Sequence, residues 1–119
     1  MSFSPPPQQW FRDIPEAIAA IEAFTRGMDF ETFRSNPMAV AAVERKLQIV
    51  SEAAIRLGRE AEQQISGQPW RDIRDLGNQL RHGYERINIQ TLWNVVTHDI
   101  PQLKAAVSRV LHANRPEEA

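Results

Sequence analysis

The sequence predicts an all-α fold, an antiparallel up-and-down four-helix bundle with a long second helix and a kinked C-terminal helix. Apolar residues recur at steps of three and four along four segments, which is the period of an amphipathic helix. Asparagine, proline and glycine stand where these segments begin and end, as is typical of helix boundaries. No segment alternates apolar and polar residues over a useful length, as a half-buried strand would.

The chain divides into an arm, one domain and a tail. Residues 1–9 carry three consecutive prolines, which predicts a flexible arm, and residues 114–119 form a polar tail. Residues 10–113 make a single helical-bundle domain. Its first helix is expected to have Asp13 as N-cap and Pro15 in the first turn, and to end at Gly27. The apolar face of this helix consists of Ile14, Ala17, Ile18, Ile21 and Phe24.

The second helix has the clearest start signal and the longest apolar stripe. Asn36 can cap it, and Pro37 stands where its missing N–H costs nothing. The pattern continues for about 28 residues, roughly 40 Å of helix, until residues 66–69 (SGQP) break it. The near-heptad stripe, typical of a helix in an antiparallel bundle, consists of Val40, Val43, Leu47, Val50, Ala54, Leu57, Ala61 and Ile65.

Two further helices complete the bundle. The third covers residues 70–84, with an apolar face of Ile73, Leu76, Leu80 and then Tyr84 or Ile87. The fourth begins near Asn88 and carries apolar residues at Leu92, Val96, Ile100, Leu103, Val107 and Val110. Pro101 lies inside this fourth segment, so we expect a kink or a restart there, with Asp99 as the new cap.

The composition narrows the classes of function. The 119 residues suffice for one modest core, and a formal net charge of −1 gives no indication of a strong general affinity for nucleic acid. The chain has no cysteine, and its three histidines lack the spacing of a metal motif, so we expect no metal site and no cofactor. No stretch could span a bilayer and the N-terminus does not resemble a signal peptide, which predicts a soluble, cytoplasmic protein without membrane contact.

A polar ridge on the third helix is the candidate site. Asn78 and His82 are four residues apart and share one face, Arg81 flanks His82, and Arg74 lies further back. Imidazole suits proton transfer near neutral pH, and guanidinium is the best fixed donor to phosphate oxygens, so the ridge fits phosphodiester chemistry. The alternative is that His82 is simply a solvated histidine at a helix surface, which is the commoner role of such a residue.

The glycines and the tyrosine of the ridge also have a structural interpretation. Gly77 and Gly83 each cost a helix about 1 kcal/mol relative to alanine, so a close helix approach, room for a ligand or local unwinding would explain them. Tyr84 would most often be a core aromatic residue with a solvated hydroxyl.

The stretch "PWRDIRDLGNQLRHGYERINIQTLWNVVTHDIPQL" resembles the HepT-like family of the HEPN superfamily, with its "N-x-L-x-H-x-Y" core and its "LWNVV…DIPQL" close. The resemblance covers most of the chain. It implies a small helical bundle, usually a homodimer, that acts as a metal-independent ribonuclease toxin on RNA. It also implies a minimal nucleotidyltransferase antitoxin as partner, which can adenylylate a tyrosine of the toxin.

Carried over to this sequence, the resemblance makes His82 the general acid/base, Asn78 a supporting polar group and Tyr84 the adenylylation target. One position departs from the family pattern, because Gly77 stands where the family has its motif arginine. Arg74 or Arg81 is then the candidate for the missing guanidinium.

Three hypotheses remain open at this level. The first is a HepT-like ribonuclease toxin, in which substitution of His82 abolishes RNA cleavage. The second is a weak or inactive partner of a nucleotidyltransferase that presents Tyr84 for modification, which the absence of the motif arginine favours. The third is a plain helical interaction module, in which alanine at His82 or at Tyr84 leaves every assay unchanged.

Overall fold

The computed structural model describes residues 7–82 and 87–113, and all regular structure in this part of the chain is helical. The elements in order are α1 (Pro7–Thr25), α2 (Phe30–Arg34), α3 (Pro37–Leu57), α4 (Arg59–Gln64), α5 (Trp70–His82), α6 (Ile89–Asn94), the π-helical turn η1 (Val95–Asp99) and α7 (Ile100–Ala113). The predicted all-α class is therefore confirmed. None of these helices combines the length and the apolar character that crossing a membrane would need.

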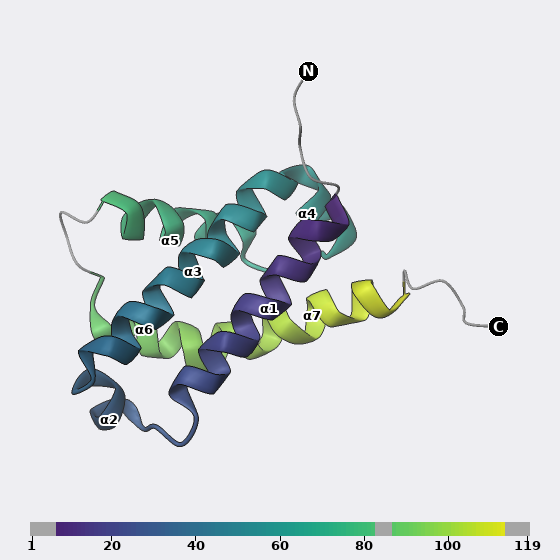
Figure 1. Ribbon diagram of the computed structural model, residues 1–119. Helices are drawn as coiled ribbons and strands as arrows, with labels where there is room; N and C mark the ends of the chain where they lie inside the picture. Colours follow the sequence, from purple (N-terminus) through teal and green to yellow (C-terminus); the bar gives the residue numbers. More distant parts are fainter. Residues whose placement is uncertain (1–6, 83–86, 114–119) are drawn as a thin grey trace.

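Helix α3 is the centre of the bundle (Figure 1). It packs along α1 on one side and along α5 on the other, while α7 packs against α1. The short α2 joins α6 through an aromatic pair, with the ring centroids of Phe33 and Trp93 5.0 Å apart. The largest fully buried apolar side chains are Phe33, Ile14, Ile18, Ile21, Leu47, Leu92, Leu103, Val43, Val50 and Val107. The predicted apolar faces of all the long helices except α5 thus contribute fully buried side chains to one core.

Helix α1 begins earlier than predicted. Its first residue is Pro7, so helical structure starts inside the segment that the sequence marks as an arm, and Pro15 lies within the helix. The prediction of Asp13 as N-cap is therefore wrong. Proline suits a helix start because its missing N–H needs no partner in the first turn, and Pro7 fulfils that role in place of Pro15.

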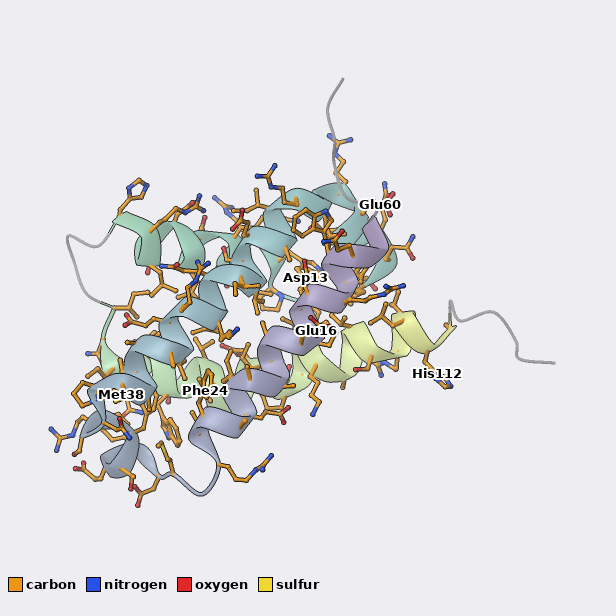
Figure 2. All side chains as sticks on the ribbon, viewed as in Figure 1. Asp13, Glu16, Phe24, Met38, Glu60 and His112 are labelled. Atoms are coloured by element: carbon orange, nitrogen blue, oxygen red, sulfur yellow. The ribbon has the colours of Figure 1, made fainter. Side chains whose placement is uncertain are left out.

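The prediction that Phe24 belongs to the core is also wrong. Its side chain is 38% exposed, and together with Met38 it projects outward where the end of α1 lies near the start of α3 (Figure 2). At about 100° per residue, Phe24 lies roughly 80° from Ile14 around the helix, at the edge of the apolar stripe.

The second predicted helix is divided in two. Its start is as predicted, since the Asn36 side chain accepts a hydrogen bond from the Ala39 N–H at 3.1 Å and Pro37 follows as the first helical residue. The predicted uninterrupted length is wrong, because α3 ends at Leu57 and Gly58 adopts φ 54° and ψ −133° before α4 begins. A positive φ is easy for glycine and unfavourable for other residues, so Gly58 permits this break.

The last helical rod begins at its predicted cap and stays continuous through Pro101. The Asn88 side chain accepts from the Gln90 N–H at 2.7 Å. Instead of a restart capped by Asp99, which is wrong, the chain widens into the π turn η1, in which the Ile100 N–H donates to the Val95 carbonyl. Proline lacks an N–H, and its ring crowds the carbonyl four residues earlier, so a turn widened by one residue accommodates Pro101 without ending the helix.

Candidate functional site

Helix α5 carries the candidate residues and is held mainly by α3. Its first residue, Trp70, is buried, and the Trp70 Nε1–H donates to the Ile65 carbonyl at 2.8 Å. The predicted apolar residues Ile73, Leu76 and Leu80 pack against the core but are only partly buried. Helix α5 is thus fixed at its start and along one side, and part of its apolar surface remains open.

Gly77 is the point where α5 lies closest to α3. The residue is buried, and a Cβ atom built on it would lie less than 3.0 Å from both the Oγ and the Cβ of Ser51. Ser51 is itself 1% exposed, and its hydroxyl donates to the Arg74 carbonyl at 3.1 Å. No side chain fits at position 77 with this helix spacing. The expectation of a close helix approach at Gly77 is therefore confirmed.

Arg74 is engaged in holding the break between α3 and α4. Its Nε donates to the Ala54 carbonyl at 3.1 Å, and one terminal nitrogen donates to the Gly58 carbonyl at 2.9 Å. The same nitrogen pairs with Glu62. Each of these carbonyls also accepts from a backbone N–H, Ala54 from Gly58 at 3.2 Å and Gly58 from Ala61 at 3.1 Å, so the guanidinium adds a second donor to both. Arg74 lies one turn before Gly77, but its charged end is directed to α3 and α4.

Arg81, Asn78 and His82 lie near the opposite end of α5. All three are exposed, and an Arg81 terminal nitrogen donates to the Asn78 Oδ1 at 3.3 Å. Asn78 is three residues from Arg81 and four from His82, so it neighbours both on the helix surface. The arginine and the histidine lie in the last turn, where positive charge interacts favourably with the helix dipole. Tyr84 and Gly83, the other residues singled out in the sequence, lie outside the described residues.

This end of α5 offers the groups that phosphate chemistry uses: an imidazole, a guanidinium and an amide, all accessible to a large ligand. Within residues 7–82 and 87–113, no group of three or more histidine, aspartate and glutamate side chains is arranged to hold a metal ion. Because its three residues are exposed at the end of α5, a nucleic acid can reach the candidate site without opening the bundle.

A groove of about 410 Å³ lies on the other side of α5, between this helix and the rod formed by α6, η1 and α7. Leu47 and Val50 of α3 contribute to its base, and both are buried. Gln79, next to Asn78 in sequence, lines the groove, while Asn78 does not. The candidate residues and the groove therefore lie on different faces of the same helix.

Comparison with known proteins agrees with the sequence resemblance. A family model described as "Ribonuclease HepT-like" matches residues 14–110. The chain belongs to this HepT-like family. A protein of Thermococcus cleftensis named "Probable ribonuclease HepT" is 33% identical over 103 residues, which cover 87% of this chain and 94% of that protein. A protein of Methanocaldococcus jannaschii named "Putative RNase MJ1380" is 33% identical over 98 residues, 82% of this chain and 90% of that protein. No solved structure matches the chain significantly.

Sequence reasoning missed two features around this HepT-like helix. It did not identify Ser51 as the partner of Gly77, although a glycine in the middle of an amphipathic helix is a usable signal of close packing. It also left open which of Arg74 and Arg81 the described residues leave accessible to a phosphate. No pattern along the chain separates these two arginines, because the acceptors of Arg74 lie 12 to 20 residues away in the sequence.

Proposed function

We propose that this HepT-like protein is an endoribonuclease that cleaves RNA without a metal ion and acts as the toxin of a toxin–antitoxin module. The observation that carries the proposal is the group formed by Asn78, Arg81 and His82 at the exposed end of α5, in a chain that belongs to a ribonuclease family. His82 is the general acid/base, Arg81 binds the phosphate, and Asn78 orients Arg81 through their hydrogen bond.

The choice of Arg81 over Arg74 rests on what each guanidinium contacts. Arg74 donates to two backbone carbonyls and pairs with a carboxylate, and phosphate binding would have to break these contacts. Within the described residues, Arg81 contacts only the exposed Asn78 Oδ1, through one terminal nitrogen at 3.3 Å, so its other N–H groups can donate to a phosphate oxygen while Asn78 stays bound. In this proposal, Arg74 supports the site by fixing α5, and Arg81 supplies the guanidinium that Gly77 cannot.

The reaction needs no nucleophile from the protein, because RNA carries its own. The 2′-oxygen attacks the adjacent phosphorus and the bond to the 5′-oxygen breaks, which leaves a 2′,3′-cyclic phosphate and a 5′-hydroxyl. A neutral imidazole accepts the 2′-hydroxyl proton, and an imidazolium gives a proton to the leaving 5′-oxygen. Guanidinium donors stabilise the negative charge that develops on the phosphate oxygens. In a homodimer, which we also propose, the two copies of His82 would supply one base and one acid.

The test is RNA cleavage by the purified protein in the presence of a metal chelator. We expect His82→Ala to lower the cleavage rate by about 10²- to 10⁴-fold, the range for loss of a general acid/base. Arg81→Ala should lower the rate by about 10²- to 10³-fold, the range for loss of one donor to developing charge. His112→Ala is the matched control, because this exposed histidine lies in the last turn of α7, far from α5 (Figures 1 and 2).

Three results would contradict the assignment. Cleavage that persists in the folded His82→Ala protein would remove this residue from the mechanism. Cleavage that is lost in the chelator would remove metal independence. An equal loss of cleavage in the His112→Ala control would point to a contaminating or unspecific effect.

A second candidate function is that of a nucleotidyltransferase partner without nuclease activity, which presents Tyr84 for adenylylation. The contact between Gly77 and Ser51 favours it, since the position of the family's motif arginine has no room for a side chain. Incubation with a minimal nucleotidyltransferase and ATP, followed by mass spectrometry, tests it. Absence of added AMP on Tyr84, with a Tyr84→Phe control, would count against this candidate.

A further inference from the structure

The groove beside α5 has an apolar interior that the described part of the chain leaves open. Leu47, Val50, Ile100 and Leu103 form its deep part and are each 4% exposed or less. Ile73, Leu76 and Val95 line it as well but are only partly buried. Burial of apolar surface is favourable by about 25 cal/mol per Å², so these partly exposed side chains would gain from a further apolar partner.

The charged residues among the described lining of this groove are all acidic. Asp72 and Asp75 of α5 and Asp99 of η1 line it, and all three residues are exposed. No lysine, arginine or histidine is among its described lining residues, and no described cation forms a salt bridge with these carboxylates. A phosphate backbone would be repelled here, so the groove is not a continuation of the RNA site.

The three carboxylates also do not converge on one point. Among the described residues they form no group that could hold a metal ion, and they come from two walls of the groove, α5 and η1. Separate negative charges around an apolar interior fit a ligand that has an apolar face with several positive charges at its margins. An amphipathic helix with lysine or arginine beside its apolar stripe has this arrangement.

We propose that this groove binds a cationic amphipathic helix of a partner protein. The groove wall formed by residues 91–103 is about 18 Å long at 1.5 Å per residue, which matches a partner helix of about three turns. Apolar side chains at spacings of three and four would enter between α5 and the rod of α6, η1 and α7. The flanking cations would face Asp72, Asp75 and Asp99, which adds specificity and speeds association more than it adds affinity.

The probe for this proposal is a synthetic helix of about 14 residues, roughly 21 Å long, made of leucine and lysine in amphipathic order. Two control peptides are a scrambled sequence of the same composition and a version with glutamate in place of lysine. Fluorescence anisotropy of labelled peptide measures binding to the full chain, and NMR chemical-shift changes locate it. We expect the leucine–lysine helix to bind at least about tenfold more tightly than either control peptide, with shifts at the groove residues.

Substitutions in the protein test whether the acidic side chains of the groove contribute to binding. Asp72→Asn, Asp75→Asn and Asp99→Asn combined should weaken binding about tenfold, because three complementary charges are removed at once. The matched control removes three carboxylates that do not line the groove, through Glu16→Gln, Glu52→Gln and Glu60→Gln. This control should bind the probe as the unmodified chain does. All six positions are on the surface, and circular dichroism checks that each variant keeps its helix content.

Several outcomes would overturn the proposal. One is equal binding of the lysine and glutamate peptides, and another is an equal effect of the two sets of substitutions. A third is a groove occupied by a second copy of this chain, which sedimentation would reveal as a dimer that the leucine–lysine helix converts to monomer. NMR shifts at the groove caused by an RNA oligonucleotide would also overturn it. Binding is measured without RNA and repeated with His82→Ala, so its result is separate from the nuclease test.

Discussion

Gly77→Ala is the substitution that most directly tests how α5 is placed on α3. In an ordinary exposed helix position the change would stabilise the protein by up to about 1 kcal/mol, because alanine has the higher helix propensity. Here the added methyl group would lie less than 3.0 Å from both the Cβ and the Oγ of Ser51, whereas carbon atoms in contact are about 3.5–4.0 Å apart. The Oγ is the end of a short side chain and can rotate, but the Cβ can move only with the backbone of α3. The two helices must therefore separate locally.

The expected cost follows from three terms. Overpacking a well-fitted contact costs about 1–3 kcal/mol. Helix separation also breaks the hydrogen bond from the Ser51 hydroxyl to the Arg74 carbonyl, now 3.1 Å long, which costs about 1 kcal/mol. The gain in helix propensity offsets about 1 kcal/mol of this. We therefore expect Gly77→Ala to lower the free energy of unfolding by about 1–3 kcal/mol.

Urea unfolding followed by circular dichroism, at one fixed protein concentration, measures this change. The decisive comparison is the same substitution in two further backgrounds. In Ser51→Gly both crowding atoms are gone, so Gly77→Ala should become neutral or stabilising by up to about 1 kcal/mol. In Ser51→Ala the Cβ remains, so Gly77→Ala should still destabilise the protein. A Gly77→Ala protein that is more stable than the unmodified chain would refute the close contact between Gly77 and Ser51.

Two further substitutions test the anchors of α5. Arg74→Ala should lower the free energy of unfolding by about 1–3 kcal/mol, because it removes two hydrogen bonds to carbonyls and the ion pair with Glu62, although each carbonyl keeps a backbone donor. Arg81→Ala, the comparison variant, should change the free energy of unfolding by less than about 0.5 kcal/mol. Similar losses in urea unfolding of the two variants would contradict their separate roles. Trp70→Phe removes the donor to the Ile65 carbonyl and leaves part of the buried indole space empty, which together should cost about 2–4 kcal/mol by the same measurement. An unchanged midpoint would show that Trp70 does not anchor the start of α5.

The fold could be predicted from the sequence where local chemistry decides it. Asn36 with Pro37, and Asn88, start helices because an amide side chain and a missing N–H satisfy the first turn, and those needs depend on neighbouring residues alone. The mistakes arose where two local signals compete. Pro7 and Pro15 can each begin a helix, and only packing selects the earlier one. Pro101 can end a helix or be accommodated by a wider turn.

The interruption at Gly58 was missed for a different physical reason. The apolar stripe continues at the expected spacing through Leu57, Ala61 and Ile65, and all three are buried, so hydrophobic periodicity holds across the break. What interrupts the helix is a glycine with positive φ whose carbonyl receives a hydrogen bond from Arg74, 16 residues away. A contact over that distance leaves no local signal.

The contact of Arg74 with Gly58 also explains why the sequence indicates the helix that carries the candidate site but not which arginine belongs to that site. The residue types and their spacing indicate α5 as the helix that carries the site, and the match to the HepT-like family does not depend on the structure. The assignment of the guanidinium, however, depends on which arginine the rest of the fold leaves accessible. Arg74 and Arg81 are seven residues apart, about two turns, so both lie on a similar face of α5. Within the described residues, the contacts of Arg74 with the Ala54 and Gly58 carbonyls and with Glu62 distinguish the two arginines.

Helix α5 has two parts with different surroundings, a packed first part and an exposed polar end. Between Trp70 and Gly77, the Trp70 ring, the Arg74 guanidinium and the close contact of Gly77 fix α5 to its neighbours, and Arg74 would have to give up its contacts to bind a substrate. From Asn78 to His82 the helix has an exposed polar face that contains the three candidate groups. An arginine placed at position 77 would collide with Ser51. Of the two candidate arginines, Arg81 is therefore the one that the described residues leave accessible for the proposed reaction.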